Sequence, residues 1–532
     1  MPKALVSVFN KEGIVEFAEG LVKLGYKIYA SGGTARKLKE AGIEVTDVAD
    51  LVGGGAILGH RVVTLSREIH ASLLARDTAE DRAELDKLGI PWIDLVCVDL
   101  YPLSDEIAKP EATLESVIEM TDIGGPTMLR SAAKGGRIVI AQPPDRDFVL
   151  KQLKEKGDLS KEERQKLAAK AEFIAAQYCL SSACFLSSGY YDGLIGEEIK
   201  RCKYGENAWQ IPATLLGLKS TDPLSLKNFQ LIAGSEPSYN NFCDLDRMLQ
   251  TITHLAAAFG LNRNKAPKLA IAVKHGNACG AAFGDQPAEV LQKMVMGDPR
   301  AIFGGLVMAN FPIGAKEADI LLTYGVAEGR RLLDGIVAPD FKTEAVDMLK
   351  RTKDKCRFLI NPALGSLSIN SLDAANRFRY VRGGFLKQLN YTFILDLHHP
   401  QLEQFGQLTA EQEDDLLLGW AINATSNSNT ITLVKNGQLI GNGVGQQDRV
   451  GAAELVVKKA IDGGHNPRGA VAVSDSFFPF PDGPKKLIDA GIKVIFATTG
   501  SVKDEEVKKV IMEAGLTLLR LPDAVARGFF GH

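Results

Sequence analysis

The chain has 532 residues, too many for one ordinary domain, so we expect two or three domains. Hydrophobic residues make up 45% and charged residues 24%, which is typical of soluble globular proteins. The net charge is −3 with acidic and basic residues interspersed, which excludes the electrostatic footprint of a nucleic-acid-binding protein. Apolar runs are shorter than the roughly 18 residues of a membrane span, and the N-terminus lacks a signal-peptide core.

Seven cysteines are scattered along the chain without a CxxC pair. This usage is typical of a reducing compartment and predicts neither a disulfide framework nor a zinc site. We therefore expect a cytoplasmic protein without a metal centre.

Strands and helices alternate over the first 150 residues. Short apolar runs predict strands at residues 3–8, 26–30, 92–99 and 137–141. Apolar residues at helical spacing predict a helix over 11–24, and a second helix follows at 35–41. This alternation predicts a parallel sheet covered by helices.

A glycine turn, Ser31-Gly32-Gly33-Thr34, lies where the second predicted strand leads into a helix. Free N–H groups and the helix dipole favour an anion such as phosphate at such a turn. A plain turn with Thr34 as N-cap is the alternative. Ser7, at the end of the first strand, faces the same crevice and favours the phosphate site. A second glycine turn follows at Asp122-Ile123-Gly124-Gly125-Pro126.

The apolar run 269–273 predicts a buried strand, and Lys274-His275-Gly276-Asn277 follows it as a loop. A lysine and a histidine side by side can hold a reacting group between a cation and a proton acceptor. A solvated surface pair is the alternative. The apolar residues before the pair and the glycines after it favour the functional interpretation.

Three other segments mark a junction and two candidate sites. Residues 158–200 are predicted to be helical and lead to a polar turn at 203–207, where we expect a domain junction. An amide-rich loop, Ser426-Asn427-Ser428-Asn429-Thr430, precedes a predicted strand at 431–434. Aromatic rings and carboxylates gather at 474–483, a combination that suits a planar heterocycle. A packed loop corner is the alternative for each of the last two.

In their order, these segments resemble one family over essentially the whole chain. It is the family of bifunctional purine biosynthesis proteins, which join AICAR formyltransferase to IMP cyclohydrolase. The segments that carry the resemblance are Ser7-Val8 with Lys11, 30–35, 59–65, Asp99-Leu100-Tyr101-Pro102, 122–130 with Ala132-Ala133-Lys134, Tyr204-Gly205-Glu206-Asn207, Lys274-His275, 301–305, Gly445-Gln446-Gln447 with Arg449, 477–482 and His532.

The resemblance implies an α/β protein of two domains. Residues 1–198 would form a methylglyoxal-synthase-like parallel-sheet domain that closes the purine ring. Residues 199–532 would form two cytidine-deaminase-like lobes that transfer the formyl group. It also implies a homodimer with transferase sites at the subunit interface. The substrates would be AICAR, formyl-AICAR and 10-formyltetrahydrofolate, and a monovalent cation is left open.

Formyl transfer needs help because the amine of AICAR is a poor nucleophile that must be oriented and deprotonated. By resemblance, His275 is the base, Lys274 steadies the oxyanion or the leaving nitrogen, and Asn429 orients the reacting groups. Each would contribute about 10²–10⁴-fold. The residues implied to contact nucleotide or folate, or to shape that pocket, are Lys203, Tyr204, Gly205, Asn207, Gly305, Asp334, Arg449, Phe477 and Asp482.

In ring closure, the carboxamide nitrogen attacks the formyl group and water leaves. By resemblance, Tyr101, Asp122 and Lys134 act at the reacting end. The residues implied to hold phosphate and ribose are Ser7, Lys11, Ser31, Gly32, Gly33, Thr34, Arg61 and Thr64. Ring closure consumes formyl-AICAR, the product of an unfavourable transfer equilibrium, and so favours further transfer. This is a physical reason to join the two activities.

The first domain departs from the family pattern at Val63, Asp99 and Phe9, where a lysine, an asparagine and a serine are usual. Val63 can neither donate a hydrogen bond nor carry charge. The alternative is therefore a formyltransferase alone, whose first domain binds nucleotide or supports a dimer.

The transferase half also departs from the pattern. Lys203 replaces an arginine, Ala208-Trp209 replaces Pro-His, and Ala424 replaces a lysine. Arg527 lies one residue farther from the terminus than is usual. A non-catalytic ligand sensor is a third hypothesis, which the retained Lys274-His275 pair disfavours.

Overall fold

The structure is a computed structural model that describes residues 1–58 and 61–531. The chain divides into two compact units, Met1–Ile195 and Gly196–His532. The sequence-based boundary lies at 198/199. Part of the predicted segment 59–65, and the whole of His532, lie outside the described residues. Among the described residues, no helix is both long and apolar enough to cross a membrane.

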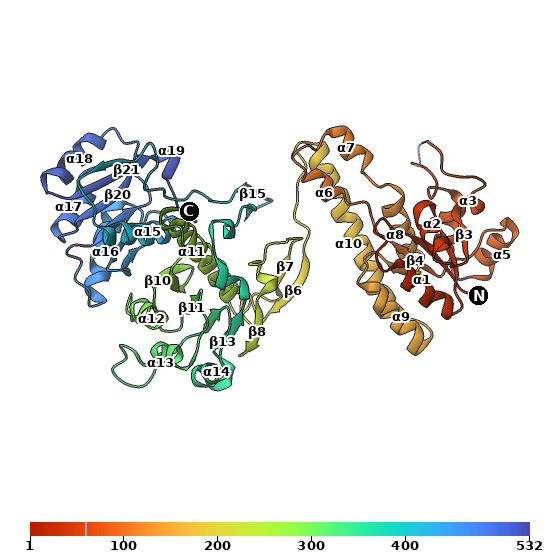
Figure 1. Cartoon of the computed structure of the whole chain (residues 1–532), viewed down its shortest axis with the longest axis horizontal. Helices are drawn as coiled ribbons and strands as arrows, with labels where there is room; N and C mark the ends of the chain where they lie inside the picture. The colour runs from red at the N-terminus through yellow and green to blue at the C-terminus, as the bar shows by residue number, and fades with distance from the viewer. Residues whose placement is uncertain (59–60, 532) are drawn as a thin grey trace. The chain divides into compact units, whose positions relative to one another are not determined.

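Unit 1 is built on a five-stranded sheet of order β3-β2-β1-β4-β5, in which every pair is parallel (Figure 1). Its strands are β1 Lys3–Ser7, β2 Lys27–Ala30, β3 Val45–Asp47, β4 Leu95–Val98 and β5 Ile138–Ile140. Its helices are α1 Ile14–Lys23, α2 Gly32–Glu40, α3 Val48–Leu51, α4 Arg67–Leu74, α5 Ala79–Leu88, α6 Leu103–Ile107, α7 Leu114–Glu119, α8 Gly124–Lys134, α9 Asp145–Lys156 and α10 Lys161–Leu186. The predicted parallel sheet is confirmed.

Three helix boundaries differ from the predictions, and glycine is involved each time. Helix α1 begins at Ile14 because Gly13, at φ 66°, cannot continue a right-handed helix. Helix α2 begins at Gly32, so that the glycine turn forms its first turn and Ser31 is its N-cap. Helix α10 ends at Leu186, shortly before Gly189 at φ 82°, instead of continuing to residue 200.

Unit 2 contains one mixed twelve-stranded sheet of order β16-β21-β20-β19-β17-β18-β10-β9-β11-β12-β13-β8. Its first lobe contains α11 Tyr239–Arg263, β9 Lys268–Lys274, β10 Asn277–Gly284, α12 Pro287–Val295, β11 Leu306–Ala309, α13 Ala315–Thr323, β12 Gly335–Ala338, α14 Thr343–Leu349 and β13 Arg357–Ile360. Its second contains α15 Ala410–Ala424, β17 Ile431–Lys435, β18 Gln438–Gly443, α16 Arg449–Asp462, β19 Val471–Ser474, α17 Asp482–Asp489, β20 Val494–Thr499, α18 Asp504–Glu513 and β21 Thr517–Pro522.

The two lobes repeat the same order of helices and strands, which confirms the predicted pair of lobes. They join where β10 pairs with β18 in the antiparallel sense. Outside this repeat lie the hairpin β6 Glu197–Cys202 with β7 Ala213–Gly217, β8 Gln230–Ala233, the hairpin β14 Asn376–Val381 with β15 Gly384–Leu389, β16 Glu403–Phe405, α19 Asp523–Ala526, and short 3₁₀ helices at Leu226–Asn228, Thr352–Asp354, Pro362–Ser366 and Ile369–Ser371.

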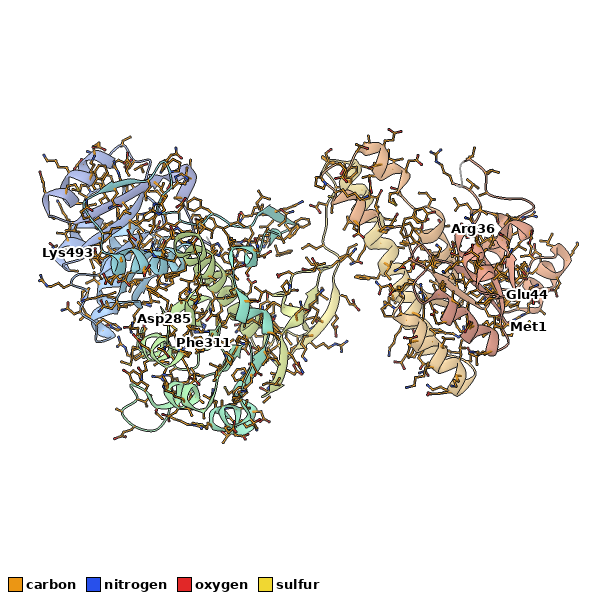
Figure 2. All side chains as sticks on the ribbon, in the orientation of Figure 1. Met1, Arg36, Glu44, Asp285, Phe311 and Lys493 are labelled. Atoms are coloured by element: carbon orange, nitrogen blue, oxygen red, sulfur yellow. The ribbon has the colours of Figure 1, made fainter. Side chains whose placement is uncertain are left out.

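Both faces of the large sheet are buried. On β9, Ile271 packs into a core with residues of α11 and α15, while Ala272 packs into a second core with residues of α12 and α13. Phe311, just after β11, is buried in that second core (Figure 2). A strand covered on both faces reads as a continuous apolar run, and this explains why 269–273 was recognisable in the sequence.

Candidate active sites

In unit 1, the predicted phosphate residues gather at the ends of β1 and β2. The Ser7 and Ser31 hydroxyl oxygens lie 3.1 Å apart. The Thr34 hydroxyl accepts a hydrogen bond from the Val8 N–H and donates one to the Val8 carbonyl, both at 3.2 Å. Thr34 is therefore not the N-cap of α2, which was the alternative considered for this turn. The result is a cluster of hydroxyls at a helix N-terminus, the setting that favours an anion.

Lys11 and Asp99 organise the loop between β1 and α1. The Lys11 ammonium donates to the Val8 carbonyl and, at 3.0 Å, to the Phe9 carbonyl. The Asp99 carboxylate accepts from the Phe9 N–H and lies 3.3 Å from the Arg146 guanidinium, which also donates to the Glu12 carbonyl at 2.9 Å. Burial raises the pKa of the Asp99 carboxyl, and the Phe9 N–H and the Arg146 charge oppose that rise. The departures Phe9 and Asp99 are thus in direct contact.

Tyr101 and Asp122 lie beside this loop. The Tyr101 ring packs against the Phe9 ring with centroids 5.4 Å apart. A Cβ at Gly125 would lie 2.3 Å from the Asp122 carboxylate, and one at Gly124 would lie 2.5 Å from the Thr64 hydroxyl, so a side chain at either position would displace one of these groups. Burial raises the pKa of Asp122, and burial followed by the Asp122 charge raises the pKa of Tyr101. Thr64, Tyr101 and Asp122 therefore form one cluster.

Two predicted residues, Lys134 and Arg61, are exposed and make no hydrogen bond or ion pair with this cluster among the contacts of the described residues. Lys134 is exposed at the last position of α8, about 15 Å along the axis from Gly124 at 1.5 Å per residue. Arg61 is exposed and pairs with Glu119. The structure does not bring Lys134 next to Asp122. Val63 is partly buried against the core of unit 1.

In unit 2, the Lys274-His275 pair forms a tight turn between β9 and β10. His275 has φ 54° and Gly276 φ 72°. The Lys274 ammonium donates to the Phe303 carbonyl at 2.8 Å, and the Asp244 carboxylate on α11 accepts the Gly276 N–H at 2.6 Å. The His275 side chain is exposed. The turn therefore presents the His275 imidazole on a backbone that the Lys274–Phe303 and Asp244–Gly276 hydrogen bonds fix on either side of it.

The second lobe repeats this turn between β17 and β18 without a histidine. Asn436 has φ 55° and Gly437 φ 73°. The Asp415 carboxylate on α15 accepts the N–H groups of Asn436 and Gly437 at 2.8 and 2.6 Å. The Lys435 ammonium donates to the Arg468 carbonyl at 2.7 Å. Lysine, turn and supporting aspartate thus occur in both lobes.

The amide loop between α15 and β17 is held by backbone and carboxylate contacts. The Asn429 N–H and side-chain amide donate to the Gln446 carbonyl at 3.1 and 3.0 Å. The Ser428 hydroxyl donates to the Asp475 carboxylate at 2.6 Å, and the Arg449 guanidinium lies 3.3 Å from the same group. Burial raises the pKa of Asp475, which the Arg449 charge opposes.

The histidine turn and the amide loop meet through shared neighbours. The Asn442 amide on β18 donates to the Ala278 carbonyl at 3.2 Å and to the Ser426 hydroxyl at 3.3 Å. On α11, one turn after Asp244, the Arg247 guanidinium donates to the Thr425 carbonyl at 2.6 Å. Helix α11 thus supports the histidine turn through Asp244 and the amide loop through Arg247. Both segments therefore lie at the junction of the two lobes of unit 2.

The remaining predicted residues fall into two groups around this junction. Gly305 follows two residues after Phe303, whose carbonyl accepts from Lys274. The Asp334 N–H donates to the Gly305 carbonyl at 3.0 Å, which places Asp334 on the same segment. Arg449 lies with its guanidinium 5.9 Å from the Phe477 ring centroid. Asp482 begins α17.

The turn at 203–207 is closed by contacts of its own. The Gly205 N–H donates to the Gln210 carbonyl at 2.8 Å, and the Asn207 N–H donates to the Gln210 side chain at 2.7 Å. The Asn240 amide near the start of α11 donates to the Glu206 carbonyl at 3.3 Å. Lys203 is exposed and Tyr204 is half-buried. The same helix that carries Asp244 therefore also contacts this turn.

Sequence reasoning missed the residues that support the site. Asp244 and Arg247 lie within a helix, Asn442 within a strand, and Phe303 acts through its carbonyl. Single polar residues inside regular elements carry no local signal. Only the three-dimensional contacts identify them.

The two polar sites on two α/β units define a two-site enzyme. The sequence profile described as AICARFT/IMPCHase bienzyme matches residues 132–459, and that described as MGS-like domain matches 13–127. The bifunctional purine biosynthesis protein PurH of Bacillus cytotoxicus is 36% identical over 97% of this chain and 98% of its own length. The PurH of Persephonella marina is 35% identical over the same shares. The chain belongs to the AICARFT/IMPCHase bienzyme family.

One solved structure, titled "Crystal structure of ForH", is 38% identical and covers 36% of this chain and 100% of its own, with a TM-score of 0.33.

Proposed function

We propose that this chain catalyses the last two steps of IMP synthesis. Unit 2 would transfer the formyl group of 10-formyltetrahydrofolate to AICAR, and unit 1 would close formyl-AICAR to IMP with loss of water. The observation that carries this proposal is membership of the bienzyme family over 97% of the chain. Nothing in the relatives favours the formyltransferase alone. We assign the first activity to residues 199–532 and the second to residues 1–198.

In the transfer step, His275 accepts the proton of the AICAR amine as the amine attacks the formyl carbon. The exposed imidazole on a turn held by Asp244 suits that role. Lys274 supplies positive charge near the developing oxyanion, and Asn429 orients the reacting groups. The bond between the formyl carbon and N10 of the folate then breaks, and N10 leaves with a proton. The Arg449 guanidinium and the Phe477 ring offer charge and an aromatic face to the nucleotide or the folate.

In the closure step, the hydroxyls at Ser7, Ser31 and Thr34 hold the phosphate. Tyr101 is protonated at neutral pH, and its raised pKa favours that state further, so that its hydroxyl can donate to the formyl oxygen. Asp122 has a raised pKa and is therefore a better proton acceptor for the carboxamide nitrogen. Lys11, whose side chain lies beside Gly33, supplies positive charge near the phosphate where Val63 replaces the usual lysine. Lys134 keeps its implied role only as a prediction.

A homodimer is also part of the proposal. The β14–β15 hairpin exposes large apolar side chains, among them Tyr380 at 82% and Leu389 at 79%. An exposed apolar patch of this kind favours burial against a partner. A cytoplasmic location and a bound monovalent cation remain predictions.

The decisive experiment supplies formyl-AICAR alone to the purified chain and follows IMP by mass. A second reaction supplies AICAR and 10-formyltetrahydrofolate. IMP in the first reaction and formyl-AICAR or IMP in the second support both activities. Failure of the first alone would leave only the formyltransferase.

A matched pair of variants tests the base. His275→Ala and Asn436→Ala both place alanine at a positive φ in the same kind of turn, so both carry the same backbone strain. We expect formyl transfer to fall about 10²–10⁴-fold in the first variant and to persist in the second. Equal losses in both would refute the assignment of His275.

A further inference from the structure

The C-terminal tail of the chain lies across the amide loop. The Phe530 N–H donates to the Ser426 carbonyl at 3.0 Å, and the Ser428 N–H donates to the Gly531 carbonyl at 3.1 Å. Asn427 and Gly531 pair as a parallel β-bridge between these two bonds. The tail therefore adds a short strand to the loop that carries Asn429.

The Phe530 ring anchors this strand between two guanidinium groups. Arg377 of β14 lies 3.5 Å from its centroid and Arg247 of α11 lies 4.4 Å from it. Arg377 also donates to the Phe530 carbonyl. Only 5% of Phe530 is exposed. Desolvated cation–π contacts are stronger than exposed ones, so the ring is a firm attachment point.

Arg247 connects the ring to the loop itself. Besides lying over Phe530, its guanidinium donates to the Thr425 carbonyl at 2.6 Å and to the Asn427 side-chain oxygen at 3.2 Å. Burial lowers the pKa of Arg247 to about 10. The Arg247 guanidinium therefore remains charged at neutral pH, and it contacts both the Phe530 ring and the amide loop.

Two glycines allow the tail to approach this closely. A Cβ at Gly531 would lie 2.5 Å from the Asn427 side-chain oxygen, and one at Gly528 would lie 2.4 Å from the Tyr391 hydroxyl. Neither position admits a side chain without a shift. These glycines belong to the stretch in which Arg527 departs from the family spacing.

We propose that Phe530 is a positioning residue for formyl transfer, which acts by fixing the amide loop and through it Asn429. The proposal rests on the proposed transferase function. The loop is held on one side by Gln446 and on the other by the tail. Without the ring, the tail loses its cation–π attachment, which weakens the bonds that it makes to Ser426 and Ser428. The loop would keep its contacts with Gln446, Asp475 and Asn442. Asn429 would then sample positions away from the reacting groups.

The test compares Phe530→Ala with wild type in both activities of the full chain. Misplacement by about 1 Å can cost roughly 10²-fold in rate, so we expect kcat for formyl transfer to fall about 10- to 100-fold. KM for AICAR should change less. Cyclisation of formyl-AICAR, measured on the same preparation, should be unchanged. Phe530→Tyr should restore most of the rate because it keeps the ring.

A double-mutant cycle distinguishes positioning from a general structural role. If Phe530 acts through Asn429, the variant that combines Phe530→Ala with Asn429→Ala should be no slower than Asn429→Ala alone. Gly531→Ala, which keeps the ring, should also slow transfer. Tyr324→Ala removes an exposed ring elsewhere in unit 2 and serves as the control.

Several results would overturn the proposal. Full transfer activity in Phe530→Ala would do so, as would additive losses in the cycle. Loss of cyclisation together with transfer would indicate unfolding rather than positioning. If wild type itself forms no formyl-AICAR, the transferase function fails instead, and the two failures are thereby distinguishable.

Discussion

Replacement of Asp99 by asparagine, the residue usual in the family, is expected to destabilise unit 1. In this chain Asp99 faces the Arg146 guanidinium, and the two side chains are only 14% and 5% exposed. Asparagine would still accept the Phe9 N–H through its oxygen. Its amide hydrogens would then point at a buried cation, which would keep the Glu12 carbonyl and the Cys97 side chain as partners but no carboxylate.

Removal of one partner from a buried ion pair costs about 3–5 kcal/mol. The retained Phe9 hydrogen bond reduces that figure, and we expect a loss of about 2–4 kcal/mol in the unfolding free energy of unit 1. That loss corresponds to roughly 30- to 700-fold faster exchange of amides that open only on unfolding. The double variant Asp99→Asn with Arg146→Gln should recover part of it, because no unpaired charge remains.

Native-state hydrogen exchange of β1 and β4 in the full chain, read by mass spectrometry, measures this change directly. Asp77→Asn is the control, because the Asp77–Arg82 pair is exposed and should contribute no more than about 1 kcal/mol. Exchange in Asp99→Asn that is no faster than in the control would refute the reasoning.

Three further predictions concern both units. Phe9→Ala should raise KM for formyl-AICAR about 2- to 12-fold in the cyclisation assay. The reason is that it removes an aromatic pair with Tyr101 worth about 0.5–1.5 kcal/mol. An unchanged KM would exclude Phe9 from the site. Gly305→Ala would bring a Cβ within 3.1 Å of the Val273 carbonyl. The rate of formyl transfer should therefore fall at least tenfold, which corresponds to a rise of about 1.4 kcal/mol in the activation free energy. Cyclisation, measured on the same preparation, should be intact. Burial raises the pKa of Asp415 from 3.8 to about 6. The folded state therefore binds more protons between these values, and the unfolding free energy should fall by about 3 kcal/mol from this group as pH rises through that window. Urea titrations at pH 4 and 6.5 should show a flatter dependence in Asp415→Asn.

The parallel sheet of unit 1 and the buried strand β9 could be predicted because their signals are local. Short apolar runs alternating with amphipathic segments are sufficient for both. Helix limits were less accurate where glycine conformation decides them, as at Gly13, whose positive φ cannot be read from the sequence.

The candidate sites were predictable in composition and order, but their assembly was not. Local patterns pointed to His275 and to Asn429 separately, and only the resemblance to a known family assigned both to one reaction. The contacts that join them run through Asn442 and Arg247, which are distant in sequence and stand within regular elements. Pairing between elements far apart in the chain is set by the tertiary fold, for which a single sequence offers no pattern.

The turn that carries His275 is part of a scaffold that both lobes share. Lys274 and Lys435 both end a strand, β9 and β17, and both donate to a carbonyl of the loop before the antiparallel neighbour of that strand, β11 and β19. Asp244 and Asp415 both support the turn from a helix. The lysine anchor and its aspartate support thus belong to the architecture itself and occur equally where no chemistry is assigned. The two copies differ at the turn residue itself, His275 in one and Asn436 in the other, on backbones of nearly equal φ. If His275 is the base of formyl transfer, as proposed, the scaffold holds that imidazole without any turn geometry of its own.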